Sequence, residues 1–339
     1  MSNWYSFKPV DTLFFRGASQ ANMGEDHSSI SIFPPPVNTI VGALRTTVLV
    51  QNGIDFEKYG KNNDKIDKNI YKTIGKAGED TPFSLVGPFF RYENTIFIPA
   101  PFSWYFDKSF SDDLEQKIFK TKEIKNSLLG KDKKYWVKGE KGEVSSIGGK
   151  WIALDALNSK NIFYIKDETK FKVKDNRFFY KDKEIDIKNS IVETSFFFKS
   201  EIRTGIALEE NRKVREGHLY SFTHNRLKEE VDIVWRVEGE NLPLKSRGIL
   251  KLGAEQRFGY YKKIEVSGFN KNSENNDKYL SLSLIKGSKE INNHIISTGK
   301  IKYIGGWDMK KRFHKEMVGY YPAGTVFSKE INNNLIKID

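Results

Sequence analysis

The sequence GILKLGAEQRFGYYKK, residues 248–263, decides the fold that we expect for this chain. An apolar pair, Ile249-Leu250, leads into a loop that begins at Gly253 and ends at Gly259. Two tyrosines and two lysines follow, in a run that is typical of a strand. The loop is not a P-loop, because Lys-Ser/Thr does not follow its glycines, and it is not a dinucleotide fingerprint, because the glycines precede a strand. The stretch therefore predicts a glycine-rich loop that opens into a strand.

This loop carries the residue types that hold RNA. Glycines let a backbone approach a phosphate chain and expose its N–H groups. Arg257 and Lys262 can neutralise phosphates, and Tyr260 or Tyr261 can stack a base. An ordinary glycine turn in a hairpin is the alternative interpretation, and the stretch alone does not separate the two. The RNA-binding hypothesis assigns the loop site to Gly253, Arg257, Gly259, Tyr260 and Lys262.

A second segment, EIRTGIALEENRKVREGHLYSF at residues 201–222, resembles a basic hairpin that reaches outward. Two strand-like ends flank a loop that carries Arg212, Lys213 and Arg215. A solvated hairpin tip is the alternative interpretation of these charges. The other strands that we expect in this half lie at 231–237, 260–266, 279–285 and 300–304, with a short helix near 241–250.

The N-terminal part of the chain predicts a strand, a polar loop and a helix. Residues 3–15 alternate as a strand does, and Arg16 stands at its end. A polar loop at 17–31 and three prolines precede a helix over 39–51, for which Asn38 is the expected N-cap. The start of a helix favours phosphate. Gly42 inside the helix costs about 1 kcal/mol against alanine, so we expect it to pack closely on a sheet.

The middle of the chain predicts a hairpin followed by an insertion. Runs at 85–91 and 95–99 flank Glu93-Asn94, which marks a turn. Residues 107–150 are rich in lysine, poor in pattern and dotted with glycine, so we interpret them as an insertion. Both halves of the chain are expected to be α+β units with antiparallel sheets. We expect an N-terminal domain at 1–190 and a C-terminal domain at 191–339.

The composition is that of a globular, basic protein. The chain has 339 residues, 38% of them hydrophobic, no cysteine and a formal net charge of +12. The lack of cysteine excludes a disulfide framework, a thiol nucleophile and thiolate metal sites. A charge of this size indicates a polyanionic partner such as nucleic acid, with a solvated lysine-rich surface as the alternative. The start of the sequence is not typical of a signal peptide and no window resembles a membrane span, so we expect a soluble, cytoplasmic protein.

The sequence contains no recognisable catalytic or metal-binding motif. Its five histidines form neither HxxxH nor HExxH, and no serine lies in a G-x-S-x-G elbow. His27, in the polar loop, could act as a general base on a ribose 2′-hydroxyl, although a solvated loop histidine is the alternative. We therefore expect no metal, no cofactor and no catalytic residue.

Five segments in this order resemble the RAMP superfamily of CRISPR ribonucleoproteins. The chain is most similar to the Cmr-type subunit of type III-B effector complexes that pairs with the polymerase-like large subunit. The matching segments are KPVDTLFFRGA (8–18), IFPPPVNTIVGALRT (32–46), the basic hairpin (201–222), LGAEQRFGYY (252–261) and GGWD with YYPAGTV (305–308 and 320–326). Ala254 departs from the family pattern, in which a second glycine is common at this position.

The resemblance implies a fold, partners and site residues. It implies two tandem ferredoxin-like (RRM-like) domains with a glycine-rich loop and insertions. It also implies a non-catalytic subunit that holds the 5′ tag of the guide RNA (crRNA), caps the complex, and contacts the large subunit and a neighbouring RAMP backbone subunit. The basic positions that match the family are Arg16, Arg45, Arg203, Arg212, Arg215 and Arg257.

Two other functions remain open from the sequence. The chain could be a metal-independent endoribonuclease that processes CRISPR repeat RNA with His27 as its base. It could also be a scaffold whose charge serves a protein partner. No sequence pattern excludes either one.

Overall fold

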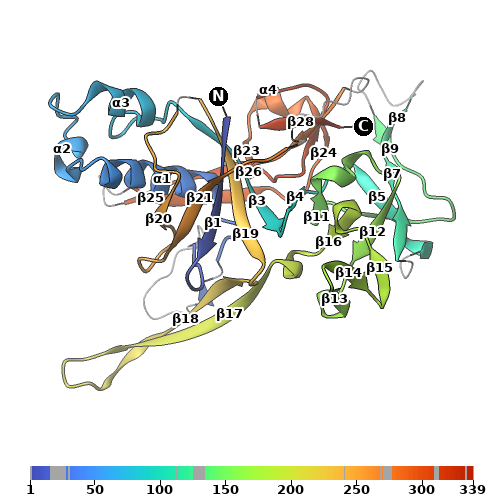
Figure 1. The fold of residues 1–339 in the computed structure, drawn as a ribbon, viewed down its shortest axis with the longest axis horizontal. Helices are drawn as coiled ribbons and strands as arrows, with labels where there is room; N and C mark the ends of the chain where they lie inside the picture. Colours follow the sequence, from blue (N-terminus) through green and yellow to red (C-terminus); the bar gives the residue numbers. More distant parts are fainter. Residues whose placement is uncertain are drawn as a thin grey trace. The chain divides into compact units, whose positions relative to one another are not determined.

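The computed structural model shows a strand-rich α+β fold (Figure 1). It describes residues 2–15, 28–29, 31–110, 114–124, 134–239, 241–267, 269, 277–308, 313–332 and 334–338. The chain forms two compact units that are interleaved along the sequence rather than consecutive. The first unit comprises Met1–Phe90, Phe197–Val266 and Ile304–Met317, and the second comprises Arg91–Phe196, Ser267–Tyr303 and Val318–Asp339. The expected domains at 1–190 and 191–339 and the tandem ferredoxin-like arrangement stay predictions.

The first unit is built around β1 (Ser2–Pro9), which is buried on both faces. β19 (Val231–Glu238) and β21 (Phe258–Ile264) pair with β1 on either side, both antiparallel. The strand order in this unit is β20-β21-β1-β19-β3, with β20 at Arg247–Lys251 and β3 at Ser84–Tyr92. The predicted glycine-rich loop therefore connects β20 to β21. The strand that follows the loop, β21, lies directly against the N-terminal strand β1.

α1 (Val37–Gln51) confirms the expected helix and packs on this sheet. Its buried stripe is Ile40, Ala43, Leu44, Thr47, Val48 and Leu49. At its end, Gln51 Nε2 donates a hydrogen bond of 2.7 Å to the Tyr261 hydroxyl. Two details of the expectation were wrong. The N-cap is Pro36 rather than Asn38, and a Cβ at Gly42 would meet no atom within 4 Å, so close packing does not explain this glycine.

The polar stretch after α1 contains two short helices. α2 (Phe56–Gly60) and α3 (Lys68–Ile74) begin at aspartates whose side chains accept backbone N–H bonds, Asp55 from Lys58 and Asp67 from Asn69. Such caps satisfy helix donors that have no partner inside the helix. The short helix expected at 241–250 was wrong, because Arg247–Lys251 forms β20 and pairs with β21.

The predicted basic hairpin is present as β17 (Phe198–Leu208) and β18 (Val214–Leu227). Figure 1 shows it as a long two-stranded ribbon. The antiparallel register runs from Phe198↔Leu227 to Leu208↔Val214, with an irregularity between Ile206 and Leu208. β2 (Ser28–Ser29) adds to β18 as a short parallel strand. Glu201, Arg203 and His224 lie on one face of the ribbon, because Glu201 is opposite His224 and Arg203 lies two residues farther along.

The second unit begins where β3 turns into β4 (Thr95–Pro99) at Glu93-Asn94, which confirms the expected hairpin. β4 is followed in the sheet by β11 (Trp151–Ala153), β16 (Ser190–Val192), β12 (Asn161–Ile165) and β6 (Glu115–Lys117). Four small sheets described in this unit complete it. Two have three strands each, in the orders β10 (Val144–Ser146)-β5 (Trp104–Asp107)-β7 (Phe119–Lys120) and β13 (Phe171–Lys174)-β14 (Arg177–Tyr180)-β15 (Lys183–Ile185). One has four strands, β24 (Ile295–Ser297)-β27 (Val326–Phe327)-β22 (Lys278–Ser281)-β28 (Leu335–Ile338), and one has two, β8 (Lys122–Glu123) and β9 (Tyr135–Trp136). A further sheet contains β23 (Ile285–Lys286), β26 (Phe313–Tyr321) and β25 (Lys302–Asp308), and α4 (Lys289–Asn292) follows β23.

Asp107 organises the described part of the lysine-rich insertion. Its buried carboxylate accepts backbone N–H bonds from Ser109 (2.9 Å), Glu140 (2.8 Å) and Lys141 (3.0 Å). Hydrogen bonds from the backbone, first that of Lys141 and then that of Ser109, lower the pKa of Asp107. A Cβ at Gly139 would approach Asp107 Oδ2 to 2.6 Å, so a side chain there would disturb this arrangement.

Gly259 provides a stability test of the sheet, and Gly42 provides its control. A Cβ at Gly259 would lie 2.3 Å from the Lys8 carbonyl oxygen and 2.6 Å from Pro9 Cα, so Gly259→Ala must push β21 away from β1. We expect Gly259→Ala to lower the free energy of unfolding by about 1–3 kcal/mol. Gly42→Ala adds a methyl group in open space on a helix and should raise it by about 1 kcal/mol. Urea unfolding measures both, and an unchanged midpoint for Gly259→Ala would contradict the packing described.

Candidate nucleic-acid interface

Three segments that are far apart in the sequence meet in the first unit. Leu13 and Asn225 of β18 exchange two backbone hydrogen bonds of 2.8 Å each. On its other side, the same segment accepts a hydrogen bond at the Phe14 carbonyl from Ala254 N at 2.9 Å. The chain after β1 therefore runs between the basic hairpin and the glycine-rich loop. Gly253 has a φ of +106°, and a Cβ there would lie 3.3 Å from the Phe14 oxygen, which explains the need for glycine.

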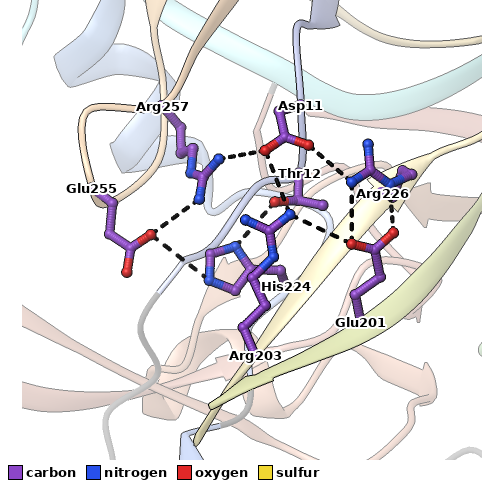
Figure 2. Close-up of polar contacts among 8 residues, drawn as sticks. All are labelled: Asp11, Thr12, Glu201, Arg203, His224, Arg226, Glu255 and Arg257. Atoms are coloured by element: carbon purple, nitrogen blue, oxygen red, sulfur yellow. Dashed lines mark hydrogen bonds and ion pairs between the residues drawn. The ribbon is translucent and has the colours of Figure 1, made fainter. Parts of the chain in front are cut away.

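Asp11 is the centre of the polar contacts at this meeting point (Figure 2). Its Oδ2 lies 2.6 Å from Arg257 Nη1, in the glycine-rich loop, and 3.4 Å from Arg203 Nη2, on β17. Its Oδ1 lies 2.9 Å from Arg226 Nη2, on β18. One carboxylate thus joins all three segments through charge-assisted hydrogen bonds and ion pairs.

Two further carboxylates complete the cluster. Glu201 accepts a hydrogen bond of 3.1 Å from Arg226 Nη2 and lies 3.5 Å from Arg203 Nη2. Glu255 accepts a hydrogen bond of 3.1 Å from Arg257 Nη2. We call the six residues the arginine–carboxylate junction, and they are Asp11, Glu201, Arg203, Arg226, Glu255 and Arg257. Its three positive charges are matched by three negative charges, so the junction as a whole is neutral.

The electrostatics of the junction favour the charged forms of Asp11 and Glu201. Partial burial raises the pKa of Asp11, but hydrogen bonds from the Thr12 amide and from Arg226, with the charges of Arg203 and Arg226, outweigh it and hold this pKa at about 2. The hydrogen bond from Arg226 also lowers the pKa of Glu201. Asp11 and Glu201 therefore stay ionised over the physiological range.

His224 lies next to the junction, and its side chain is almost fully buried, at 1% exposure. Its Nδ1 lies at hydrogen-bond distance, 3.1 Å, from the Thr12 hydroxyl, and its ring stacks on Phe14 with centroids 5.4 Å apart. Nε2 lies 3.8 Å from Glu255 Oε2. Burial lowers the pKa of His224, which favours the neutral imidazole at neutral pH.

The sequence matches the family described as CRISPR-associated protein (Cas_Cmr3) over residues 5–286. The chain belongs to the CRISPR-associated Cmr3 family. This assignment confirms the resemblance to RAMP subunits of type III Cmr complexes, and the match includes four of the five segments that carried it. No curated protein matches the chain.

Solved structures of a type III-B CRISPR complex share the fold of this Cmr3-family chain. A chain of the type III-B Cmr-beta complex bound to cognate target RNA aligns with a TM-score of 0.53 and 16% identity, over 96% of this chain and 86% of that one. The same complex with target RNA and AMPPnP gives a TM-score of 0.52 and 16% identity, over 96% and 85%. A chain of the Csm3–Csm4 subcomplex of type III-A gives a TM-score of 0.46 and 13% identity, over 99% and 94%.

The structure places two of the predicted site residues, Arg203 and Arg257, inside the junction. Both guanidinium groups already contact carboxylates there, so their expected RNA contacts stay predictions. Sequence reasoning missed their partners Asp11, Arg226 and the two glutamates. Asp11 had one visible signal, because it is the only acidic residue in the segment KPVDTLFFRGA, which carries part of the resemblance.

The tip of the basic hairpin carries two more of the predicted residues. Arg212 and Lys213 are exposed, and neither forms an ion pair with any described residue. Arg212 has a φ of +61°, and a hydrogen bond of 2.9 Å from its N–H to the Glu209 carbonyl closes the turn. Arg215 belongs to β18, and Arg16 and His27 lie outside the described residues.

Arg45 has a structural role in the first unit. Its Nε donates to the Ile74 carbonyl at 2.9 Å, and its Nη2 donates to the carbonyls of Lys76 at 3.3 Å and Glu79 at 3.0 Å. These bonds satisfy carbonyl groups at and after the end of α3. The donors of Arg45 are thus directed to the protein backbone, and its expected RNA contact stays a prediction.

The remaining predicted residues lie on β21 or next to it. Gly259 is buried against β1, while Tyr260 is 60% exposed and Lys262 is exposed. Tyr261 is 1% exposed and its hydroxyl is bonded to Gln51, so it cannot stack a base, and Tyr260 is the tyrosine that can. Within the described ranges, no group of three or more His, Asp, Glu or Cys side chains could hold a metal ion. Helices in that same part of the chain are too short or too polar to span a membrane.

Asp11 predicts a specific dependence of stability on pH. A folded-state pKa of about 2, below the ordinary 3.8, means that the ionised carboxylate stabilises the fold above pH ~4 and that this contribution is lost as the pH falls through about 2. Asp11→Asn should therefore lower the free energy of unfolding by a constant amount at neutral pH, and the difference from wild type should shrink between about pH 4 and pH 2. The loss should be smaller than the whole pKa shift implies, because Asp11 is 38% exposed and solvent screens it.

Urea unfolding at a series of pH values measures this difference. Asp64→Asn, at an exposed aspartate outside the junction, is the matched control and should show no effect of comparable size. A difference between wild type and Asp11→Asn that did not change down to about pH 2 would show that Asp11 is not held ionised by the arginines.

Proposed function

We propose that this chain is a non-catalytic crRNA-binding subunit of a type III-B Cmr ribonucleoprotein in the cytoplasm. In this proposal it holds the 5′ tag of the guide RNA and bridges to the polymerase-like large subunit and to a neighbouring RAMP backbone subunit. The observation that carries the proposal is the convergence of the three segments at Asp11, because these same segments carry the resemblance to RNA-binding RAMP subunits. A solved relative of the same fold belongs to a Cmr-beta complex bound to cognate target RNA.

The junction acts in this proposal as a support rather than as the main phosphate site. Its charges cancel, and a neutral cluster attracts a polyanion weakly. It does fix the basic hairpin and the glycine-rich loop relative to each other, through Arg226 on one side and Arg257 on the other. Arg203 and Arg257 contact RNA in the assembled complex only where a phosphate group replaces a carboxylate as their partner.

The attraction for RNA comes from cations outside the junction. Arg212 and Lys213 stand at the end of the long ribbon, exposed and without ion-pair partners among the described residues. A ribbon of this kind holds its terminal cations away from the rest of the unit. There they can contact the phosphates of a bound RNA. Arg16 and Arg215 remain part of the proposed RNA site on the resemblance alone.

Charge reversal at the hairpin tip tests the proposal. Arg212→Glu with Lys213→Glu should weaken binding of a 5′-tagged guide RNA by about tenfold or more at moderate salt, because repulsion replaces the attraction of two cations for phosphate. The matched control is Lys181→Glu with Lys183→Glu, which reverses two exposed lysines near the β14–β15 turn of the second unit. Fluorescence anisotropy with tagged and untagged guide RNA measures the effect. Equal affinity of wild type and tip variant for the tagged RNA would contradict the proposal.

Incubation with repeat RNA tests the non-catalytic part of the proposal. The purified chain in the presence of a chelator should leave labelled CRISPR repeat RNA intact over the time in which it binds the RNA fully. Specific cleavage that is lost in His27→Ala would overturn this part and establish the endoribonuclease alternative. Cleavage that persists in His27→Ala and is absent from a mock purification would also overturn this part, whereas cleavage in the mock purification identifies a contaminating nuclease.

A further inference from the structure

One ionisable side chain of the first unit is buried where the three segments meet (Figure 2). His224 of β18 is 1% exposed, although histidine is the side chain that gains a charge near neutral pH. Its Nδ1 lies 3.1 Å from the Thr12 hydroxyl, and its Nε2 lies 3.8 Å from Glu255 Oε2. Thr12 follows β1, and Glu255 belongs to the glycine-rich loop. One imidazole on the basic hairpin therefore lies against both of the other segments.

The charged groups around His224 come from every segment that packs against it. Glu255 of the loop and Asp11 after β1 favour an imidazolium, whereas Arg203 of β17 and Arg257 of the loop oppose it. Burial is the largest effect, and together with the two arginines it outweighs the carboxylates and lowers the pKa of His224. Glu255 is also already engaged, because it accepts a hydrogen bond from Arg257. The closed arrangement therefore suits a neutral imidazole.

The loop side of this contact contains a strained turn. The N–H of Arg257 donates to the Ala254 carbonyl at 3.3 Å, and the two residues between them, Glu255 and Gln256, have φ angles of +56° and +55°. Two consecutive left-handed residues are usual for Asn-Gly and similar pairs, not for Glu-Gln. Such a conformation persists only while the surrounding structure holds it. Here the bond from Ala254 N to the Phe14 carbonyl, at 2.9 Å, is part of that hold.

We propose that neutral His224 keeps the glycine-rich loop closed against the basic hairpin, and that its protonation opens this contact while the rest of the unit stays folded. In the closed state the ring is shielded from water between Thr12, Phe14 and the loop. In the open state the strained turn moves away and water solvates the imidazolium. The proton thus acts as a ligand that binds the open state more tightly than the closed one.

The burial of His224 determines the direction of the pH dependence. In the open state the ring has the ordinary histidine pKa of about 6.5, and in the closed state its pKa is lower. Well above pH ~6.5 neither state holds the proton, so pH has no effect. Below it the open state takes up a proton that the closed state lacks, and the ratio of open to closed rises by up to about tenfold for each pH unit. Asp11 and Glu201, whose pKa values are lowered, stay ionised in this range.

The contact joins the two segments to which the proposed function assigns RNA. Acidification would therefore release the hairpin and the loop from each other at this point. The inference itself concerns the free chain and does not rest on that function, so its test contains no RNA.

Amide hydrogen exchange in the full-length protein, followed by NMR, tests the contact directly. Opening breaks the hydrogen bond from Ala254 N to the Phe14 carbonyl. The protection factor of the Ala254 amide, corrected for the intrinsic effect of pH on exchange, should fall by about tenfold between about pH 7.5 and pH 5.5. The internal control is the Ser281 amide of the second unit, which donates to the Thr325 carbonyl at 2.8 Å and should keep its protection.

Two variants remove the titrating group in different ways. His224→Gln keeps a side chain that can hydrogen-bond to Thr12, and His224→Phe keeps a ring that can stack on Phe14. In each variant that retains the circular dichroism of wild type, the protection of the Ala254 amide should be the same at both pH values. The matched control is His294→Gln, at a half-buried histidine of the second unit, and it should retain the tenfold fall.

The outcomes decide the inference. A fall at Ala254 that is absent from the His224 variants, with Ser281 unchanged, supports it. Equal protection of Ala254 at the two pH values in wild type would overturn it. An equal fall in wild type and in the His224 variants would assign the pH dependence to another group and would also overturn it. A parallel fall at Ser281 would show unfolding of the whole chain instead of a local opening, with the same consequence.

Discussion

The ion pairs of Asp11 with three arginines are the interaction on which the first unit depends. Arg257 comes from the glycine-rich loop, Arg226 and Arg203 come from the two strands of the basic hairpin, and Asp11 itself follows the N-terminal strand. Removing Asp11 would leave three arginines without this shared carboxylate, at a cost that solvent reduces because Asp11 is 38% exposed. The backbone bonds of Leu13 and Phe14 hold the same three segments together, so geometry and charge support one arrangement.

This arrangement divides the basic residues of the chain into two groups. Those near Asp11 are used to hold the fold, as Arg45 is at the end of α3. Arg212 and Lys213, at the hairpin tip, form no ion pair with any described residue. The formal net charge of +12 belongs to the whole chain, whereas the junction itself is neutral and attracts RNA weakly. The positions of the cations that have no acidic partner indicate where a polyanion binds.

The sequence predicted most of the local elements correctly, and the predicted RNA contacts of the site residues stay predictions. The helix after the three prolines, the hairpin at Glu93-Asn94 and the basic hairpin follow from periodicity and turn residues, which act over a few positions. The errors concern contacts with distant segments. Gly42 meets no neighbour although close packing was expected, and 247–251 pairs as a strand because β21 lies beside it. Likewise, the sequence does not show which of Tyr260 and Tyr261 is exposed. The packing of α1 decides that Tyr261 is the buried one.

What the sequence by itself determined was the family, the strand-rich α+β class and the presence of a glycine-rich loop and a basic hairpin, because each rests on local residue order. What only the tertiary structure decided was which charges are available. An arginine has the same appearance in the sequence whether it meets a phosphate or a carboxylate. The difference lies in a partner such as Asp11, which is 246 positions away from Arg257 and reaches it only when the sheet brings β1 beside β21.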